Sequence, residues 1–347
     1  MPGNEATELL RERPLDFIRR YAISPPNQAK QQVGLDALGQ PRIDVSQTLT
    51  NRRTLWTDPG GVIGTGTGTV THQRVSAGRV QHASVIDITT GEKSGAKTLE
   101  MSPNESDSRV PVHFLPWGSE QLIDMKIPEA GPDTDDPSNP RIFFTAALSG
   151  CSIFVDGDPK RPRVVHAGID GALNTGARGF WEERLVDLAR QSGQPIDDHM
   201  RSIDKSRYMN TDMAIHYRNW LRHEYSDTLT IKGVTEWGAV FGIRFGSLWS
   251  FYLQRNATVT TTRLLKKRMV EKYQPNSTTT RYRTRDGGAP VEMQTVRKGK
   301  GILAHDKKIY VLQEIANRPM GVEEFYPGKG GTGGVRMGIE SRYQALF

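Results

Sequence analysis

Short apolar or alternating segments recur along the chain from about residue 70 onward. Clusters of Gly, Pro, Asn and Asp separate them, which is typical of β-strands joined by turns. The pattern predicts a first set of strands at Arg79–Ile88, Arg109–Leu115, Gln121–Ile127, Arg141–Leu148, Ser152–Asp156 and Arg163–His166. It predicts a second set at Trp237–Phe245, Leu248–Arg255, Thr258–Leu264 and Pro290–Arg297, and a hairpin over Ile302–Ile315.

Helical periodicity is confined to three segments. One short helix is predicted over Glu5–Tyr21, and apolar residues at helical spacing predict amphipathic helices over Gly179–Ser192 and Thr211–Arg222. Strands and helices do not alternate as a parallel βαβ sheet requires. We therefore expect an α+β fold with a mixed or antiparallel β-sandwich core and flanking helices.

The chain divides by composition near residue 60. Residues 1–60 are rich in Arg, Gln, Asn and Pro, which predicts a loosely packed N-terminal arm, whereas 61–347 are expected to form the β-rich body and a single domain. The sequence leaves two roles open for residues 1–60: an arm related to secretion, or a part of the fold. Met1–Arg20 lacks the basic head and apolar core of a secretory signal, and no apolar run is long enough to span a membrane. The protein is expected to stay in the cytoplasm or to leave by a signal-independent route.

Charge is distributed unevenly along the 347 residues. The chain has 46 Lys and Arg against 39 Asp and Glu, and its mean hydropathy is −0.55, which excludes a disordered acidic chain and a membrane-embedded one. The stretch from Arg255 to Asp286 contains nine Lys or Arg residues and only two acidic residues. This stretch is either a solvated face or a surface for an acidic protein or RNA. Few aromatic residues interleave it, and no nucleic-acid motif accompanies it, so nucleic acid is not the expected partner.

Cys151 is the only cysteine, which excludes an internal disulfide and a cysteine-rich zinc site. The histidines form no metal-binding motif, so no metal is expected. Two apolar runs flank the polar tip 157–160, which predicts a hairpin in which Asp156 pairs with Arg161 and Cys151 lies opposite His166. A one-residue slip would separate the pair. Cys151 is then either a small buried apolar residue or a nucleophile activated by His166.

The residues around Cys151 resemble the active site of bacterial glutamine deamidase toxins, of the cytotoxic necrotizing factor and Burkholderia lethal factor type. The motif Leu148-Ser149-Gly150-Cys151 occurs with a threonine six residues before the cysteine, Thr145, and a histidine fifteen residues after it, His166. The similarity covers about 25 of the 347 residues.

The resemblance implies a cysteine-dependent deamidase that converts a glutamine of a target protein to glutamate. Cys151 is the expected nucleophile, His166 the base and Thr145 the residue that orients His166, while backbone N–H groups of Ser149–Cys151 bind the oxyanion. No cofactor is needed. A toxin or virulence effector of this kind acts in the cytoplasm of a host cell on a protein such as a small GTPase or translation factor; the alternative location is the bacterial cytoplasm.

Two other functions stay open on the sequence. The same Cys–His pair serves a thiol protease or a transglutaminase, because all three reactions pass through a thioester. A non-catalytic basic module that binds an acidic protein or RNA is the alternative of a different class. The reactivity of Cys151 with iodoacetamide in the native state separates a catalytic thiol from a structural one.

Overall fold

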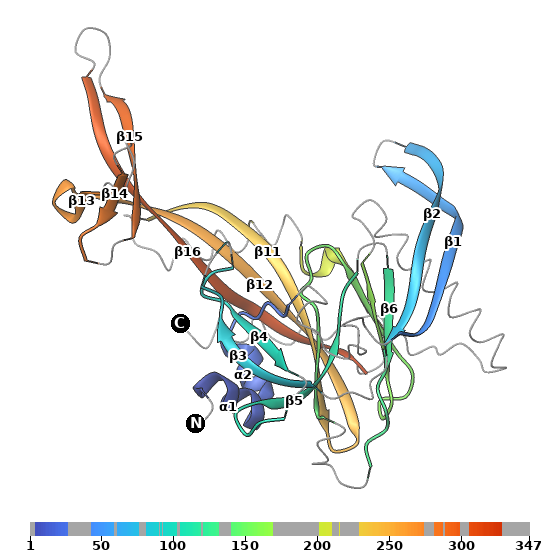
Figure 1. The fold of residues 1–347 in the computed structure, drawn as a ribbon. Coiled ribbons are helices and arrows are strands. Elements are labelled where there is room, and N and C mark those ends of the chain that lie inside the picture. The colour runs from blue at the N-terminus through green and yellow to red at the C-terminus, as the bar shows by residue number, and fades with distance from the viewer. Residues whose placement is uncertain are drawn as a thin grey trace.

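The structure is a computed structural model. It describes residues 4–26, 43–58, 61–75, 81–89, 91, 93–102, 105–118, 121–131, 140–168, 201–209, 215, 229–273, 281–286, 289–298 and 305–327. The described part is mostly β, with two helices and two sheets, one of ten strands and one of six (Figure 1).

Two short helices, α1 (Glu5–Glu12) and α2 (Pro14–Arg20), begin the described chain. The side chain of Asn4 accepts a hydrogen bond from the backbone N–H of Thr7 at 2.9 Å and caps α1. Pro14 suits the first turn of α2, because that position needs no backbone N–H donor. The predicted single helix is therefore two helices.

The larger sheet contains ten strands in the order β13-β14-β15-β16-β12-β11-β7-β5-β3-β4. All neighbours are antiparallel except β5 and β7, which are parallel. The strands are β3 (Gln81–Asp87), β4 (Lys97–Ser102), β5 (Val110–Leu115), β7 (Ile142–Thr145), β11 (Leu229–Phe245), β12 (Leu248–Leu265), β13 (Val270–Tyr273), β14 (Arg281–Thr284), β15 (Pro290–Lys298) and β16 (His305–Tyr326).

The smaller sheet has the order β1-β2-β6-β9-β8-β10, in which only β2 and β6 are parallel. Its strands are β1 (Ile43–Asp58), β2 (Gly61–Val75), β6 (Gln121–Lys126), β8 (Ser152–Asp156), β9 (Arg163–Ala167) and β10 (Arg201–Ile203). Single 3₁₀ turns follow β10 and β12, at Lys205–Arg207 and Lys267–Met269. The expected boundary at residue 60 lies between β1 and β2 in the chain, outside the described residues, and a delivery role for residues 1–60 stays a prediction.

The central part of the larger sheet is buried on both faces. Alternate residues of its strands therefore pack into two different hydrophobic cores, one on each face. On β7, Ile142 and Phe144 pack with α1 and α2, whereas Phe143 packs with residues of the smaller sheet. The first core also contains Leu10 and Phe17 of the helices, each fully buried. The N-terminal segment is therefore part of the core, which corrects the expectation of a loosely packed arm.

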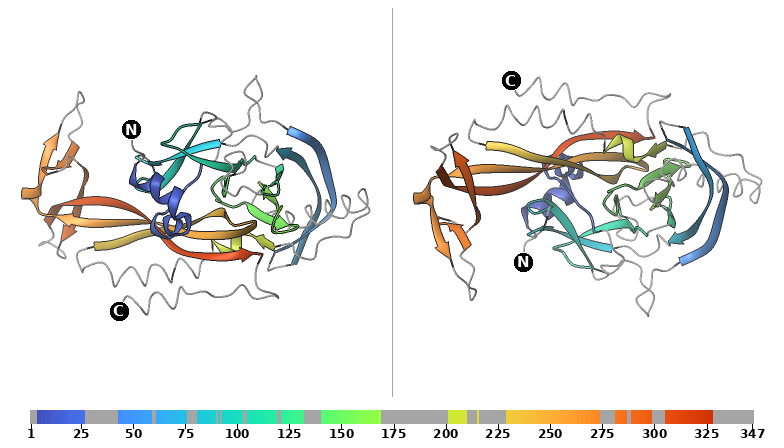
Figure 2. Two further views of the ribbon diagram at one scale, coloured as in Figure 1. Left: turned by 90° about the horizontal axis from the view of Figure 1, so that it is seen from below. Right: turned by 90° about the horizontal axis from the view of Figure 1, so that it is seen from above.

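Long strands carry the chain away from this layered body. β11 and β12 form a hairpin whose turn contains Gly246, which adopts a positive φ of 60°. β16 pairs with β12 along the body and with β15 beyond it (Figures 1 and 2). The hairpin expected over Ile302–Ile315 is wrong, because β16 is one continuous strand whose two ends pair with different partners.

The sequence predicted the type of most described strands, and β8 has its predicted limits. Two predicted strands, Leu248–Arg255 and Thr258–Leu264, are one strand, β12, because the intervening Asn256 and Ala257 also pair on both sides. The predicted helix 179–192 lies outside the described residues, as does nearly all of 211–222. No helix within the described ranges combines the length and apolar character needed to cross a membrane.

Phe143→Ala is expected to destabilise the fold by about 3 to 5 kcal/mol, because it empties a fully buried position between the two sheets. Phe245→Ala is the matched control, since its side chain at the end of β11 is 53% exposed, and it should cost less than about 1 kcal/mol. Urea denaturation followed by circular dichroism measures both. Equal losses for the two variants would contradict the layered packing.

Candidate active site

Strands β8 and β9 form the hairpin that carries the predicted site, with a register two residues away from the expected one. Asp156 pairs with Arg163, and Ile153 pairs with His166. The connection is six residues long because Asp158 makes a tight turn, accepting a hydrogen bond from the backbone N–H of Arg161 at 2.8 Å. Cys151 therefore lies diagonally from His166 instead of directly opposite it.

A shift of two residues keeps both side chains on the same face of the sheet, because side chains alternate with period two. Cys151 packs in the core between the sheets together with Ile153 of β8 and Val164 of β9. His166 follows Val164 on the same face and is fully buried. Both candidate residues thus point from the smaller sheet toward the larger one.

Thr145 meets His166 from the opposite sheet. It ends β7, two residues after Phe143, and so faces the same core. Its Oγ1 lies 2.6 Å from Nδ1 of His166, and both side chains are fully buried. The threonine and the histidine of the predicted site are therefore joined by a hydrogen bond that crosses between the two sheets.

The Thr145 hydroxyl contacts both Nδ1 of His166 and the carbonyl oxygen of Ala146, which is 3.2 Å away. When the hydroxyl donates its single proton to that carbonyl, it accepts from the ring at Nδ1. A neutral imidazole protonated at Nδ1 carries its lone pair on Nε2. Nε2 of His166 is buried and has no hydrogen-bond partner among the described residues. This is the tautomer that a general base requires.

The turn before Cys151 is held from two sides. Leu148 forms a pair of backbone hydrogen bonds with Gly238 of β11, at 2.9 and 3.1 Å. Gly150 has a positive φ of 140°, which favours glycine. The hydroxyl of Tyr208 accepts from the N–H of Gly150 at 2.9 Å and donates to the carbonyl oxygen of Cys151 at 2.7 Å. The Gly150 N–H is therefore occupied in this structure.

Ion pairs fix the segment that carries Tyr208. Arg207 and Arg255 both bind the carboxylate of Glu323 on β16, and Arg255 Nε also donates to the carbonyl oxygen of Arg207 at 2.8 Å. The ring of Tyr208 lies against Gly238, where a Cβ atom would come within 3.0 Å of it. Tyr208 is thus clamped between the larger sheet and the Cys151 turn.

Trp117 lies beside the thiol. One step beyond the last β8–β9 pair, Gly168 stands opposite Cys151. A Cβ atom on Gly168 would lie 2.4 Å from Nε1 of Trp117 and 2.0 Å from the carbonyl oxygen of Gly118. The indole therefore packs directly on the glycine that stands opposite Cys151.

Burial keeps both reactive groups neutral in this structure. It raises the pKa of the Cys151 thiol to about 12, although hydrogen bonds from Trp117 and the backbone of Ser149 act in the opposite direction. Burial also lowers the pKa of His166 to about 3. The described state therefore contains a neutral thiol and a neutral imidazole, and no hydrogen bond joins Nε2 of His166 to Cys151.

Sequence reasoning missed three residues that shape this site: Trp117, Gly168 and Tyr208. They come from segments before and after the hairpin, and only the fold brings them to Cys151. Gly168 carries a weak signal, because a glycine directly after a buried strand marks a close approach of another segment. No spacing in the sequence connects Tyr208 or Trp117 to Cys151.

No protein-family model matches this chain, and no curated protein matches its sequence. The resemblance to glutamine deamidase toxins therefore rests on the residues from Thr145 to His166.

Stability is expected to fall as the pH is lowered from about 6.5 to 3, because unfolded His166 binds a proton below about 6.5 whereas the folded side chain stays neutral until about 3. The loss from this residue is roughly 3 to 5 kcal/mol over that range. Urea denaturation at several pH values, compared with His166→Gln, measures it. The variant should have the shallower pH dependence, and identical slopes would contradict the buried neutral imidazole.

Proposed function

We propose that this protein is a cysteine-dependent deamidase that hydrolyses the side-chain amide of a glutamine in a target protein. Cys151 is the nucleophile, His166 the general base and Thr145 the residue that orients it. The observation that carries the proposal is the 2.6 Å hydrogen bond between Thr145 and Nδ1 of His166, which leaves Nε2 as a buried acceptor on the face that Cys151 shares.

In the first step, the Cys151 sulfur attacks the carboxamide carbon of glutamine while its proton moves to Nε2 of His166. A sulfur–carbon bond forms and the carbonyl oxygen becomes an oxyanion. Because both groups are neutral at rest, this proton transfer accompanies the attack instead of preceding it. His166 then gives the proton to the departing nitrogen, and ammonia leaves as the carbon–nitrogen bond breaks.

In the second step, water attacks the thioester. His166 takes one proton from the water, the carbon–sulfur bond breaks, and the proton returns to the sulfur as glutamate is released. Every proton passes through Nε2, and the reaction uses one water and releases one ammonia. The chain's own groups suffice for these steps.

The oxyanion requires donors close to the sulfur. The Gly150 N–H is engaged by Tyr208, so we assign this role to the N–H of Cys151 and the indole N–H of Trp117. The Trp117 Nε1 atom is buried and has no oxygen partner among the described residues. A buried donor without an acceptor is costly unless an acceptor arrives during the reaction.

The depth of the thiol favours a side-chain amide as substrate. Cys151 is 7% exposed, so a reactive group must reach inward to it. The carboxamide of glutamine is the terminal group of a side chain with two methylene groups, whereas a backbone amide is bonded to the polypeptide chain on both sides. This supports deamidation over proteolysis, and it supports water over a second bulky amine as the acceptor of the acyl group.

The biological role that we propose rests on the same resemblance. We propose that the protein is an effector that acts in a host cytoplasm on a protein such as a small GTPase or translation factor. The core shared by the two sheets is the packing expected of a β-sandwich, which is the scaffold that we propose for this activity.

Cys151→Ala and His166→Ala should each abolish deamidation, because they remove the nucleophile and the group that transfers every proton. Thr145→Val should lower the rate roughly 10 to 100-fold and leave residual activity, since the imidazole is present but free to rotate or change tautomer. Lys160→Ala, at the exposed tip of the hairpin, is the control for the fold.

Intact-mass spectrometry of purified small GTPases and translation factors, incubated with each variant, provides the measurement. A deamidated product gains about one dalton and the reaction releases ammonia. Full activity in Cys151→Ala would refute the nucleophile. New chain termini would identify a protease, and cross-linked products would identify a transglutaminase.

Trp117→Phe should reduce the turnover rate roughly 10 to 100-fold with little change in KM, because it keeps a ring on Gly168 and removes only the N–H that the oxyanion needs. Circular dichroism should show an unchanged fold. A rise in KM at constant turnover would instead identify Trp117 as a residue that binds the substrate.

A further inference from the structure

We infer that the distal end of the larger sheet binds an extended acidic segment of a partner protein, which pairs along the open edge of β15 and inserts an apolar side chain into a neighbouring pocket. The distal module consists of the described residues 266–273, 281–286, 289–298 and 305–310. This inference does not depend on the proposed deamidase activity, because the module lies at the opposite end of the long strands from the smaller sheet (Figure 2).

Among the described residues, β15 has a neighbouring strand on only one side over most of its length. β15 pairs with β16 from Val291 to Lys298. On its other side, the pairing with β14 involves only Val291 and Pro290, so within the described part of the module Glu292–Lys298 has no strand beside it. Residues 294–298 are all exposed. Such an edge presents backbone donors and acceptors to an added strand.

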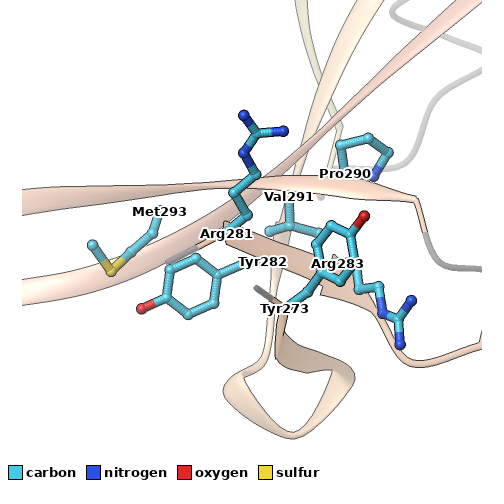
Figure 3. A pocket seen from close by; sticks show the side chains of 7 residues that line it. All are labelled: Tyr273, Arg281, Tyr282, Arg283, Pro290, Val291 and Met293. Carbon is cyan, nitrogen blue, oxygen red and sulfur yellow. The ribbon is translucent and has the colours of Figure 1, made fainter. Parts of the chain in front are cut away.

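A pocket of about 520 Å³ opens where β14 and β15 separate (Figure 3). Its residues come from three strands and are Tyr273, Arg281, Tyr282, Arg283, Pro290, Val291 and Met293. Val291 is buried, and Tyr282 and Met293 are half-buried, whereas both arginines are exposed. The lining thus has apolar side chains on one face of β14 and β15 (Tyr282, Val291, Met293) and arginines on the other, which suits a segment that alternates apolar and acidic residues.

The charge of the module determines the sign of its partner. It contains eleven Lys or Arg against four Asp or Glu, and all eleven basic side chains are exposed. By contrast, Arg255 and Arg263 on β12 are paired with Glu323 and Glu314. In the distal module Arg283 is paired with Glu271, and the other exposed cations outnumber the acidic residues. The basic stretch seen in the sequence is thus not one surface, because most of its cations lie at the distal end.

Register places cations on both faces of the open edge. Arg281 and Arg283 share one face with Lys298 and its neighbour Lys307, whereas Arg297 and Lys308 lie on the other. An added strand projects its side chains alternately to the two faces, so acidic residues at any position of the segment meet a cation.

The tyrosines favour a protein over a nucleic acid. The guanidinium of Arg283 lies 4.9 Å from the ring centre of Tyr273 and covers one face. The ring of Tyr282 packs edge-on against Tyr310, with ring centres 5.3 Å apart, inside the small core of the module. Single-stranded nucleic acids need aromatic faces that are open for stacking, whereas an open strand edge recognises an extended backbone.

The test uses the full chain and a fluorescein-labelled eight-residue peptide that alternates Glu and Val, with binding followed by fluorescence anisotropy. Arg281→Glu should weaken binding about tenfold or more, since it reverses a charge at the pocket rim. Lys126→Glu, the same change at an exposed position of β6, should leave binding unchanged. Equal effects of the two variants would overturn the location of the site.

Two further forms of the peptide, N-methylated at the odd or at the even positions, test pairing along the edge. Only every second amide of an added strand faces β15, so one form should lose binding and the other should keep it. Equal binding of both forms would overturn strand addition. A single-stranded oligonucleotide of the same charge that binds more tightly than the peptide would replace the protein partner with nucleic acid.

Discussion

The candidate site depends on one contact between the two sheets, the buried hydrogen bond from His166 of the smaller sheet to Thr145 of the larger one. Side chains alternate between the two faces of each strand, and this alternation directs both residues inward. Thr145 follows Phe143 on the inner face of β7, and His166 follows Val164 on the inner face of β9. The apolar core around them sets the distance between the sheets. The packing that stabilises the core therefore also sets the orientation of the proposed base.

Burial of the imidazole imposes a free-energy cost on this arrangement. Nε2 of His166 is enclosed without a partner among the described residues, and an unsatisfied polar group of this kind costs about 1 to 3 kcal/mol. Burial also holds the Cys151 thiol and the imidazole in their neutral forms. For the deamidase that we propose, a site that is neutral and closed at rest would limit side reactions of the thiol.

The long strands separate this closed site from the charged surface. β12 runs from the body, where Arg255 and Glu323 hold the segment of Tyr208, to the basic module around β14 and β15, and β16 runs back from that module to the body. Exposed charges act over about a Debye length, so cations at the distal end attract an acidic partner without disturbing the buried pair. The two ends therefore meet different physical demands: low polarity at one, and solvent-exposed charge at the other.

The sequence by itself determined the β-rich class, most strands and the joint occurrence of Thr145, Cys151 and His166, because period-two alternation and turn residues are local signals. It did not determine the register of β8 and β9, since the turn at Asp158 lengthened the connection to six residues. Cys151 and His166 still share the inner face of the sheet, because the register differs from the predicted one by two residues and side chains alternate with period two. The site also includes Trp117, Gly168 and Tyr208, through contacts between segments distant in the chain. Long-range packing of this kind produces no residue spacing from which the contacts could be predicted. Tertiary structure alone decided how the turn is held and that β15, over most of its described length, has a strand on only one side, because both depend on contacts between segments far apart in the chain.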